Sequence, residues 1–131
     1  YQGLNDMLNA EPLIEYVKKV ERIVEGEQQA DEFLRLYLIP GMNHCRGGSG
    51  VDTFDWVSEI QAWVEEGTAP GTVIGYRRDN DTSLPGAKAW PLDSKTVLKS
   101  RPVYDYPYSA RYSGQGDKND ASSFEPKPLS F

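Results

Sequence analysis

The segment that most constrains the fold is an almost unbroken apolar run, FLRLYLI, at residues 33–39. An apolar run that does not alternate with polar residues is typical of a β-strand buried on both faces, as in a parallel sheet. Pro40 and Gly41 end the run, and the chain's only histidine and only cysteine, His44 and Cys45, follow within five residues. Because chemistry in open α/β sheets takes place at the carboxyl ends of the strands, the pattern predicts an α/β fold with a functional loop after residue 39.

Length and charge narrow the classes of partner. A chain of 131 residues is long enough for one domain with a modest core. Its net charge is −6, with no stripe of Lys and Arg to offset it, so we expect no nucleic-acid partner. No apolar run is long enough to cross a bilayer, and no signal peptide is recognisable, so we expect no membrane partner. The chain opens at Tyr1 and not at Met, which predicts a processed or excised piece of a longer protein.

The first 40 residues have the pattern of a strand–helix–strand crossover. Residues 1–9 are predicted to be the end of a strand and the loop after it, which contains Asp6. Pro12 opens a predicted helix that continues to about residue 25. The helix carries an apolar stripe of Leu13, Val17, Val20 and Val24. A polar linker at residues 27–32 then leads to the strand, and a crossover of this kind implies two parallel strands. Asp6 and His44 would therefore lie after neighbouring strands, at one edge of the sheet.

A second helix and a short strand are predicted after the histidine. The helix begins at an Asp52 or Thr53 cap and runs to about residue 66, where Gly67 ends it. Its predicted buried stripe consists of Val57, Ile60 and Val64, with Trp56 and Trp63 interpreted as core residues beside it. A strand is expected at residues 72–76.

The character of the sequence changes after residue 77. Residues 78–131 are rich in tyrosine and proline and show no helical period. Long irregular segments are unusual unless they wrap a folded body, so we expect an extended, mostly irregular tail packed on the rest of the chain. The predicted division is therefore 1–77 and 78–131.

Asp6 and His44, 38 positions apart, are candidates for the carboxylate–imidazole pair of a nucleophile–base–acid site. The acid precedes the base, which is the order found in α/β-hydrolases. A histidine on a surface loop with no catalytic role is the alternative. No G-x-S-x-G turn occurs in the chain, and Ser49 in GGSG is a poor nucleophile candidate because no strand leads into an elbow turn there.

Cys45 cannot form an internal disulfide, because it is the only cysteine. It is a buried thiol, a reactive thiol, or half of a bridge to a partner outside these residues. One histidine and one cysteine without paired spacing do not suggest a metal site, and the GGSG stretch lacks the lysine of a phosphate-binding loop. We therefore expect neither a metal nor another cofactor in this segment.

Four stretches together resemble the tannase and feruloyl esterase family of α/β-hydrolases: YQGLND, FLRLYLIPGMNHCRGGSG, FDWVSEIQAWVEEGTAPGTVIGYR and RPVYDYPYSARYSGQGDKNDASSFEP. The resemblance implies that Asp6 is the acid and His44 the base of a Ser-Asp-His triad. It also implies that the serine, the oxyanion hole and the lid lie upstream, so that this chain is the C-terminal part of an α/β-hydrolase. Cys45 would form a disulfide to a missing upstream cysteine just before that serine. Tyr104 and Pro126 stand where many members carry a further cysteine pair, which would leave the tail without a covalent tether.

The function that the resemblance implies is a secreted or periplasmic serine carboxylic-ester hydrolase. Its substrates would be small aromatic esters of the feruloyl or galloyl type, its partner would be the upstream part of the same enzyme, and the isolated chain would be inactive. The alternative is a non-catalytic module whose tyrosine-rich tail binds a carbohydrate or a protein.

Overall fold

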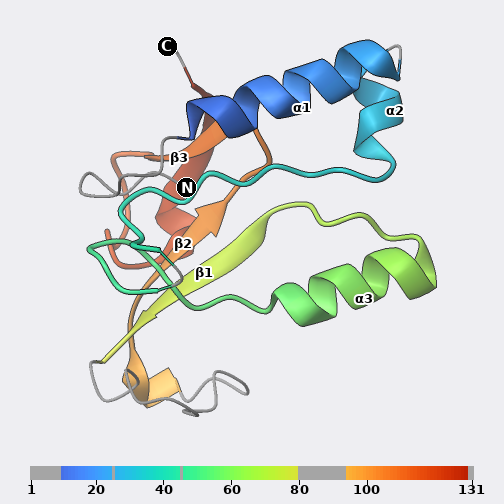
Figure 1. Cartoon of the computed structure of the whole chain (residues 1–131). Coiled ribbons are helices and arrows are strands. Elements are labelled where there is room, and N and C mark those ends of the chain that lie inside the picture. The colour runs from blue at the N-terminus through green and yellow to red at the C-terminus, as the bar shows by residue number, and fades with distance from the viewer. Residues whose placement is uncertain (1–9, 25, 45, 80–93, 130–131) are drawn as a thin grey trace.

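The computed structural model describes residues 10–24, 26–44, 46–79 and 94–129. Its longer elements are helices α1 (Glu11–Ile23), α2 (Glu27–Asp31) and α3 (Trp56–Glu66), and strands β1 (Val73–Arg78), β2 (Val97–Val103), β3 (Tyr108–Tyr112) and β4 (Phe124–Pro128). Short 3-10 turns, η2 (Ser94–Thr96) and η3 (Ala121–Ser123), precede β2 and β4. The strands form two antiparallel pairs, β1–β2 and β3–β4 (Figure 1).

Helix α1 agrees with its prediction at the start and differs in the face that it buries. Pro12 lies in its first turn, where a missing N–H costs no hydrogen bond. Its buried residues are Ile14 and Val17, whereas Leu13 of the predicted stripe is 47% exposed. The predicted polar linker at residues 27–32 instead contains α2, which begins after Gly26. The spacing of apolar residues therefore identified the helix and the buried Val17, but it wrongly included Leu13 and missed Ile14.

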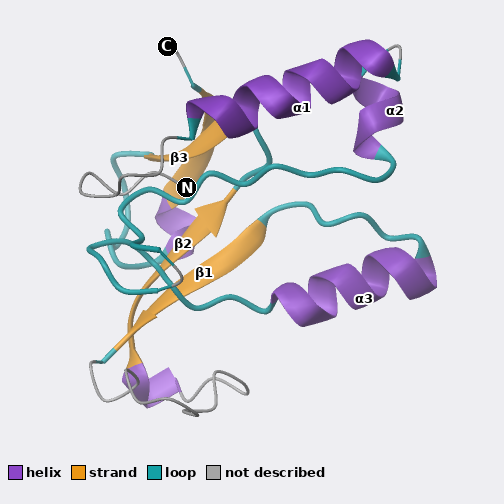
Figure 2. Ribbon diagram, in the orientation of Figure 1, coloured by secondary structure: helices purple, strands orange, loops and turns teal. Residues whose placement is uncertain are grey.

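Residues 33–39 form a loop segment with one isolated bridge, at Tyr37, and not the continuous strand that was expected (Figure 2). The backbone N–H of Leu36 donates to Asp105 Oδ1 over 3.1 Å, and its carbonyl oxygen accepts from the N–H of Tyr106 over 2.7 Å. The bridge between Tyr37 and Asp105 is antiparallel. The other strand of the expected crossover falls in residues 1–9, outside the described residues. All strand pairs among the described residues are antiparallel.

The apolar run has no alternation because it supplies two separate clusters. The first cluster consists of Ile14, Val17 and Leu36, with Leu34, Leu38 and Tyr106 packed around it. The second cluster consists of Ile39, Val51 and Val103, with Tyr37, Met42, Phe54 and Trp56 packed around it. Burial on both sides of a segment produces an apolar run whether its backbone partners are parallel strands or, as here, residues that follow β2.

The tail contains more regular structure than predicted. Strand β2 pairs with β1 from Val73–Val103 to Arg78–Val97, and the β3–β4 pair follows it. Proline does not interrupt these strands, because two-stranded sheets consist only of edge strands. Tyr104 and Arg101 both contact Phe124: the Tyr104 hydroxyl donates to its carbonyl oxygen over 3.5 Å, and the Arg101 guanidinium lies 4.2 Å from its ring centroid. These non-covalent contacts attach the start of β4 to the end of β2.

Helix α3 has the predicted end and a different cap. The side chain of Asp55 caps it by accepting the backbone N–H of Ser58 over 3.2 Å, and Gly67 ends it in the left-handed conformation. The prediction of a buried stripe is wrong for this structure: the exposed fractions are 73%, 52% and 78% for Val57, Ile60 and Val64. Within the described residues, this apolar face therefore lies in solvent.

Candidate active site

The predicted histidine lies on a loop, Gly41–Gly50, which we call the histidine loop. Its ends are joined by a hydrogen bond from the Gly50 N–H to the Gly41 carbonyl oxygen, 2.7 Å long. Met42 and Gly48 form an antiparallel bridge. Gly48 has φ +88°, and a Cβ at this position would collide with the Gly41 carbonyl oxygen. The narrow loop therefore requires glycine at this position.

His44 lies exposed in the turn of this loop. Hydrogen bonds flank it on both sides: the Asn43 N–H donates to the Gly47 carbonyl oxygen over 3.0 Å, and the Arg46 N–H donates to the carbonyl oxygen of His44 itself over 2.9 Å. The backbone that carries the imidazole is therefore held in one turn, while the imidazole stays accessible. An accessible imidazole on a fixed backbone meets the first requirement of a general base.

Two charged side chains from outside the loop attach it to the β1–β2 pair. Asp52 accepts the Gly47 N–H over 2.7 Å and pairs with Arg77 of β1 over 3.3 Å. Lys99 of β2 donates to the Ser49 carbonyl oxygen. Burial, followed by repulsion from Arg101 and Arg77, lowers the pKa of the Lys99 amine. Neither anchor was predicted, because nothing in the sequence links Asp52 to Arg77, 25 positions later.

Asp6 and Cys45 lie outside the described residues, so the Asp6–His44 pair and the disulfide of Cys45 stay predictions. Ser49, the poor nucleophile candidate, is exposed and engages Lys99 through its carbonyl oxygen.

A second, half-buried network of charged side chains, also not predicted from the sequence, fixes the segment that leads into the histidine loop. Arg35 pairs with Asp105 over 3.2 Å and with Asp31 over 2.7 Å. Burial raises the pKa of the Asp105 carboxyl, and the guanidinium of Arg35 opposes that rise. The hydroxyl of Tyr37 lies 2.9 Å from the carbonyl oxygens of both Pro70 and Gly71. Burial, then the charge of Asp105, raises the pKa of Tyr37 to about 12.

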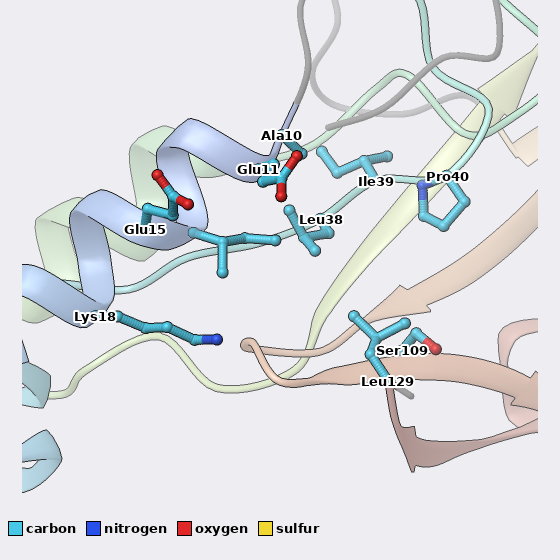
Figure 3. Close-up of a pocket in the computed structure, with 10 residues that line it drawn as sticks. Ala10, Glu11, Glu15, Lys18, Leu38, Ile39, Pro40, Ser109 and Leu129 are labelled. Atoms are coloured by element: carbon cyan, nitrogen blue, oxygen red, sulfur yellow. The ribbon is translucent and has the colours of Figure 1, made fainter. Parts of the chain in front are cut away.

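A groove of about 600 Å³ lies between α1, residues 38–40 and the β3–β4 pair. Figure 3 shows the side chains that line it. Apolar residues from two segments and charged side chains of α1 line it: Leu38, Ile39 and Pro40 on one segment, Leu129 on the other, and Glu11, Glu15 and Lys18 on α1. His44 is not among its lining residues, so this groove does not bring a ligand to the imidazole.

The described residues contain no group of three or more His, Cys, Asp or Glu side chains arranged to hold a metal ion. None of the helices in the described ranges has both the length and the apolar character needed to cross a membrane. The expectation of no cofactor stays a prediction.

A sequence profile of the family described as "Tannase and feruloyl esterase" matches residues 1–126. The chain is 35% identical over 125 residues to the mono(2-hydroxyethyl) terephthalate hydrolase of Piscinibacter sakaiensis, covering 95% of this chain and 18% of that protein. It is 34% identical over 128 residues to a probable feruloyl esterase of Arthroderma benhamiae, covering 95% of this chain and 21% of that protein. The chain therefore spans about one fifth of the length of these relatives.

Among solved structures, the crystal structure of feruloyl esterase B from Aspergillus oryzae superposes with a TM-score of 0.70 at 25% identity. The matched part covers 92% of this chain and 24% of that one. An esterase from the same organism superposes equally well, with a TM-score of 0.70 at 24% identity over 92% of this chain and 25% of that one.

Proposed function

The chain belongs to the tannase and feruloyl esterase family, and from this premise we propose that it forms the C-terminal part of a serine carboxylic-ester hydrolase. The observation that carries the proposal is the histidine loop, which presents the exposed His44 on a fixed turn inside the matched residues. Relatives named as hydrolases and esterases support ester hydrolysis as the reaction.

In the proposed mechanism, His44 takes the proton from a serine in another part of the enzyme as the serine oxygen attacks the ester carbonyl carbon. The tetrahedral intermediate collapses to an acyl-enzyme when His44 protonates the departing alcohol oxygen. Water then attacks the acyl-enzyme with His44 again as base, which releases the acid and restores the serine. Asp6 holds the imidazole in the required tautomer and stabilises its positive form.

The proposed substrates are small esters of hydroxylated aromatic acids of the feruloyl or galloyl type. The names of the relatives support an aromatic acyl group, since they include a feruloyl esterase and a terephthalate ester hydrolase. The groups that select among such esters would lie outside this chain, which spans only a fifth of these relatives.

The remainder of the enzyme is the proposed partner of this chain. The apolar face of α3, formed by Val57, Ile60 and Val64, supports this, because a solvated face of that kind is unfavourable unless another part of the protein covers it. The chain by itself is accordingly expected to be inactive. We further propose that Cys45 pairs with a cysteine beside the nucleophilic serine, which fits a secreted or periplasmic location.

The test replaces His44 with Ala in the complete protein and follows release of ferulate and gallate from their methyl esters. We expect kcat/KM to fall by about 10⁴-fold or more, because the serine loses its base. Ser49→Ala is the control: it removes a hydroxyl on the same loop and is expected to leave the rate little changed. Activity that survives His44→Ala would contradict the proposal. Loss of activity in Ser49→Ala would indicate that Ser49 is the nucleophile and that no serine from another part of the enzyme is needed.

The alternative, a binding module with a tyrosine-rich tail, has less support. Three tyrosines of this region make contacts within the chain: the Tyr104 hydroxyl donates to the carbonyl oxygen of Phe124, Tyr106 packs on the first cluster, and Tyr112 meets the Phe124 ring edge-on, with ring centroids 5.7 Å apart. Thiol titration of the protein isolated from its source, before and after reduction, separates the two functions. A thiol at Cys45 that appears only after reduction favours the esterase, and a free thiol from the outset favours the binding module.

A further inference from the structure

We propose that Asp52 is a positioning residue for His44. Its carboxylate fixes the histidine loop, and Arg77 holds that carboxylate in place. This inference rests on the proposed function, because it assigns Asp52 a part in the same reaction. Asp52 contacts neither the substrate nor the reacting atoms in this proposal; it acts through the backbone.

Asp52 lies where it can join the loop to the sheet. Its own N–H donates to the Tyr76 carbonyl oxygen over 3.0 Å, and the next residue, Thr53, exchanges two backbone hydrogen bonds with Tyr76, 3.1 and 2.9 Å long. The backbone of Asp52 is therefore attached to β1. Its side chain reaches back five residues and accepts the N–H of Gly47 over 2.7 Å.

Gly47 is the residue that passes this constraint to the histidine. Its N–H is held by Asp52, and its carbonyl oxygen accepts the N–H of Asn43, the residue directly before His44. The contacts form a continuous path from β1 through Asp52 and Gly47 to Asn43. The second anchor, the bond from Lys99 to the Ser49 carbonyl oxygen, holds the loop after Gly47. It is not part of the path from β1 to Asn43.

The charge of Asp52 matters because of Arg77. The guanidinium lies 3.3 Å from Oδ2, the same oxygen that accepts the Gly47 N–H, and both side chains are largely buried, with exposed fractions of 15% and 22% for Asp52 and Arg77. A hydrogen bond to an ionised carboxylate is shorter and stronger than one to a neutral amide. An asparagine would keep an acceptor for Gly47 and lose the ion pair, whereas an alanine would lose both.

The experiment compares Asp52→Ala and Asp52→Asn in the complete protein, with kcat calculated per folded molecule and the folded fraction measured by circular dichroism. A shift of about 1 Å in a catalytic group can cost about 100-fold in rate. We therefore expect kcat to fall by about 10- to 100-fold in Asp52→Ala, with KM within about twofold of the parent value. Asp52→Asn should recover part of the loss, because its amide oxygen still accepts from Gly47.

Asp55→Ala is the matched control. Asp55 is also a carboxylate that accepts a backbone N–H, that of Ser58, but it caps α3 and has no bond to the histidine loop. It should lower the melting temperature while leaving kcat per folded molecule unchanged. If Asp52→Ala does not fold, Asp52→Asn and Arg77→Met carry the same comparison.

The outcomes separate the two proposals. If His44→Ala abolishes activity and Asp52→Ala lowers kcat no more than Asp55→Ala does, the positioning role is wrong and the esterase stands. A loss confined to KM, or no recovery in Asp52→Asn, also overturns the positioning role. If His44→Ala stays active, the proposed function itself fails.

Discussion

The histidine loop and helix α3 are neighbours in the sequence, but they are stabilised in opposite ways. The loop is closed by its own backbone hydrogen bonds and held by Asp52 and Lys99, so its conformation is specified within this chain. Helix α3 has a capped start and a glycine end, yet it exposes its apolar face. Contacts within this chain therefore specify the loop, whereas the apolar face of α3 lies in solvent in the described structure.

The sharpest test of this comparison uses two glycines with positive φ. Gly48→Ala places a methyl group against the Gly41 carbonyl oxygen, so we expect the free energy of unfolding to fall by about 3 kcal/mol and activity with it. Gly67 at the end of α3 has φ +69° and open space around it, and Gly67→Ala should cost about 1 kcal/mol. Urea denaturation followed by tryptophan fluorescence measures both. Equal losses would contradict the distinction between loop and helix.

The second test concerns the cluster beneath the loop. Val103 is 4% exposed and contributes to the second cluster with Ile39 and Val51. Val103→Ala removes buried apolar surface and leaves a small cavity, so it should lower the free energy of unfolding by about 2 kcal/mol. Urea denaturation of the same chain measures it. A loss below about 0.5 kcal/mol, the size expected for a surface position, would show that the cluster does not support the loop.

The third test measures how the stability of the protein depends on pH through Tyr37, in the segment that leads into the histidine loop. Tyr37 links the second cluster to the backbone at Pro70 and Gly71, and its pKa in the folded protein is raised to about 12. An acid whose folded pKa is raised adds stability that is present below its unfolded pKa and is lost as the pH rises. Stability should therefore decline between pH 10 and about 12. Tyr37→Phe should be less stable at neutral pH but show a shallower alkaline decline in thermal melts. An unchanged slope would contradict this assignment.

The smallest effect is expected on α3. Val64 is 78% exposed, so Val64→Ala should change the stability of this chain by less than about 0.5 kcal/mol. In the complete protein the same substitution should cost more, about 1–2 kcal/mol, if the remainder of the enzyme covers this face. Thermal melts of both forms supply the comparison. The same small effect in the complete protein would indicate that the face stays in solvent.

The sequence alone predicted the elements that are defined by local chemistry. Pro12 at the start of α1, Gly67 at the end of α3, and a strand near residues 72–76 are all present, because helix ends and turns depend on a few adjacent residues. The position of His44 in a loop after the apolar run followed from Pro40 and Gly41 in the same way.

The predictions that failed depended on distant partners. The apolar run at residues 33–39 indicated burial correctly, but its backbone bonds go to Asp105 and Tyr106, which no local pattern reveals. Likewise the tail was expected to be irregular, since tyrosine and proline obscure alternation, and β2 became recognisable only through its pairing with β1. The anchoring of the histidine loop by Asp52 and Arg77 was missed for the same reason.

The contacts of Arg101 and Tyr104 with Phe124 affect how the protein responds to reducing agents. These contacts involve no sulfur, so the end of the chain keeps its attachment in reducing and oxidising surroundings alike. Cys45 is the only cysteine of the sequence, so under the disulfide proposed above a mild reductant would act on this chain at Cys45, and the resulting inactivation would test the histidine loop and not the contacts of Phe124.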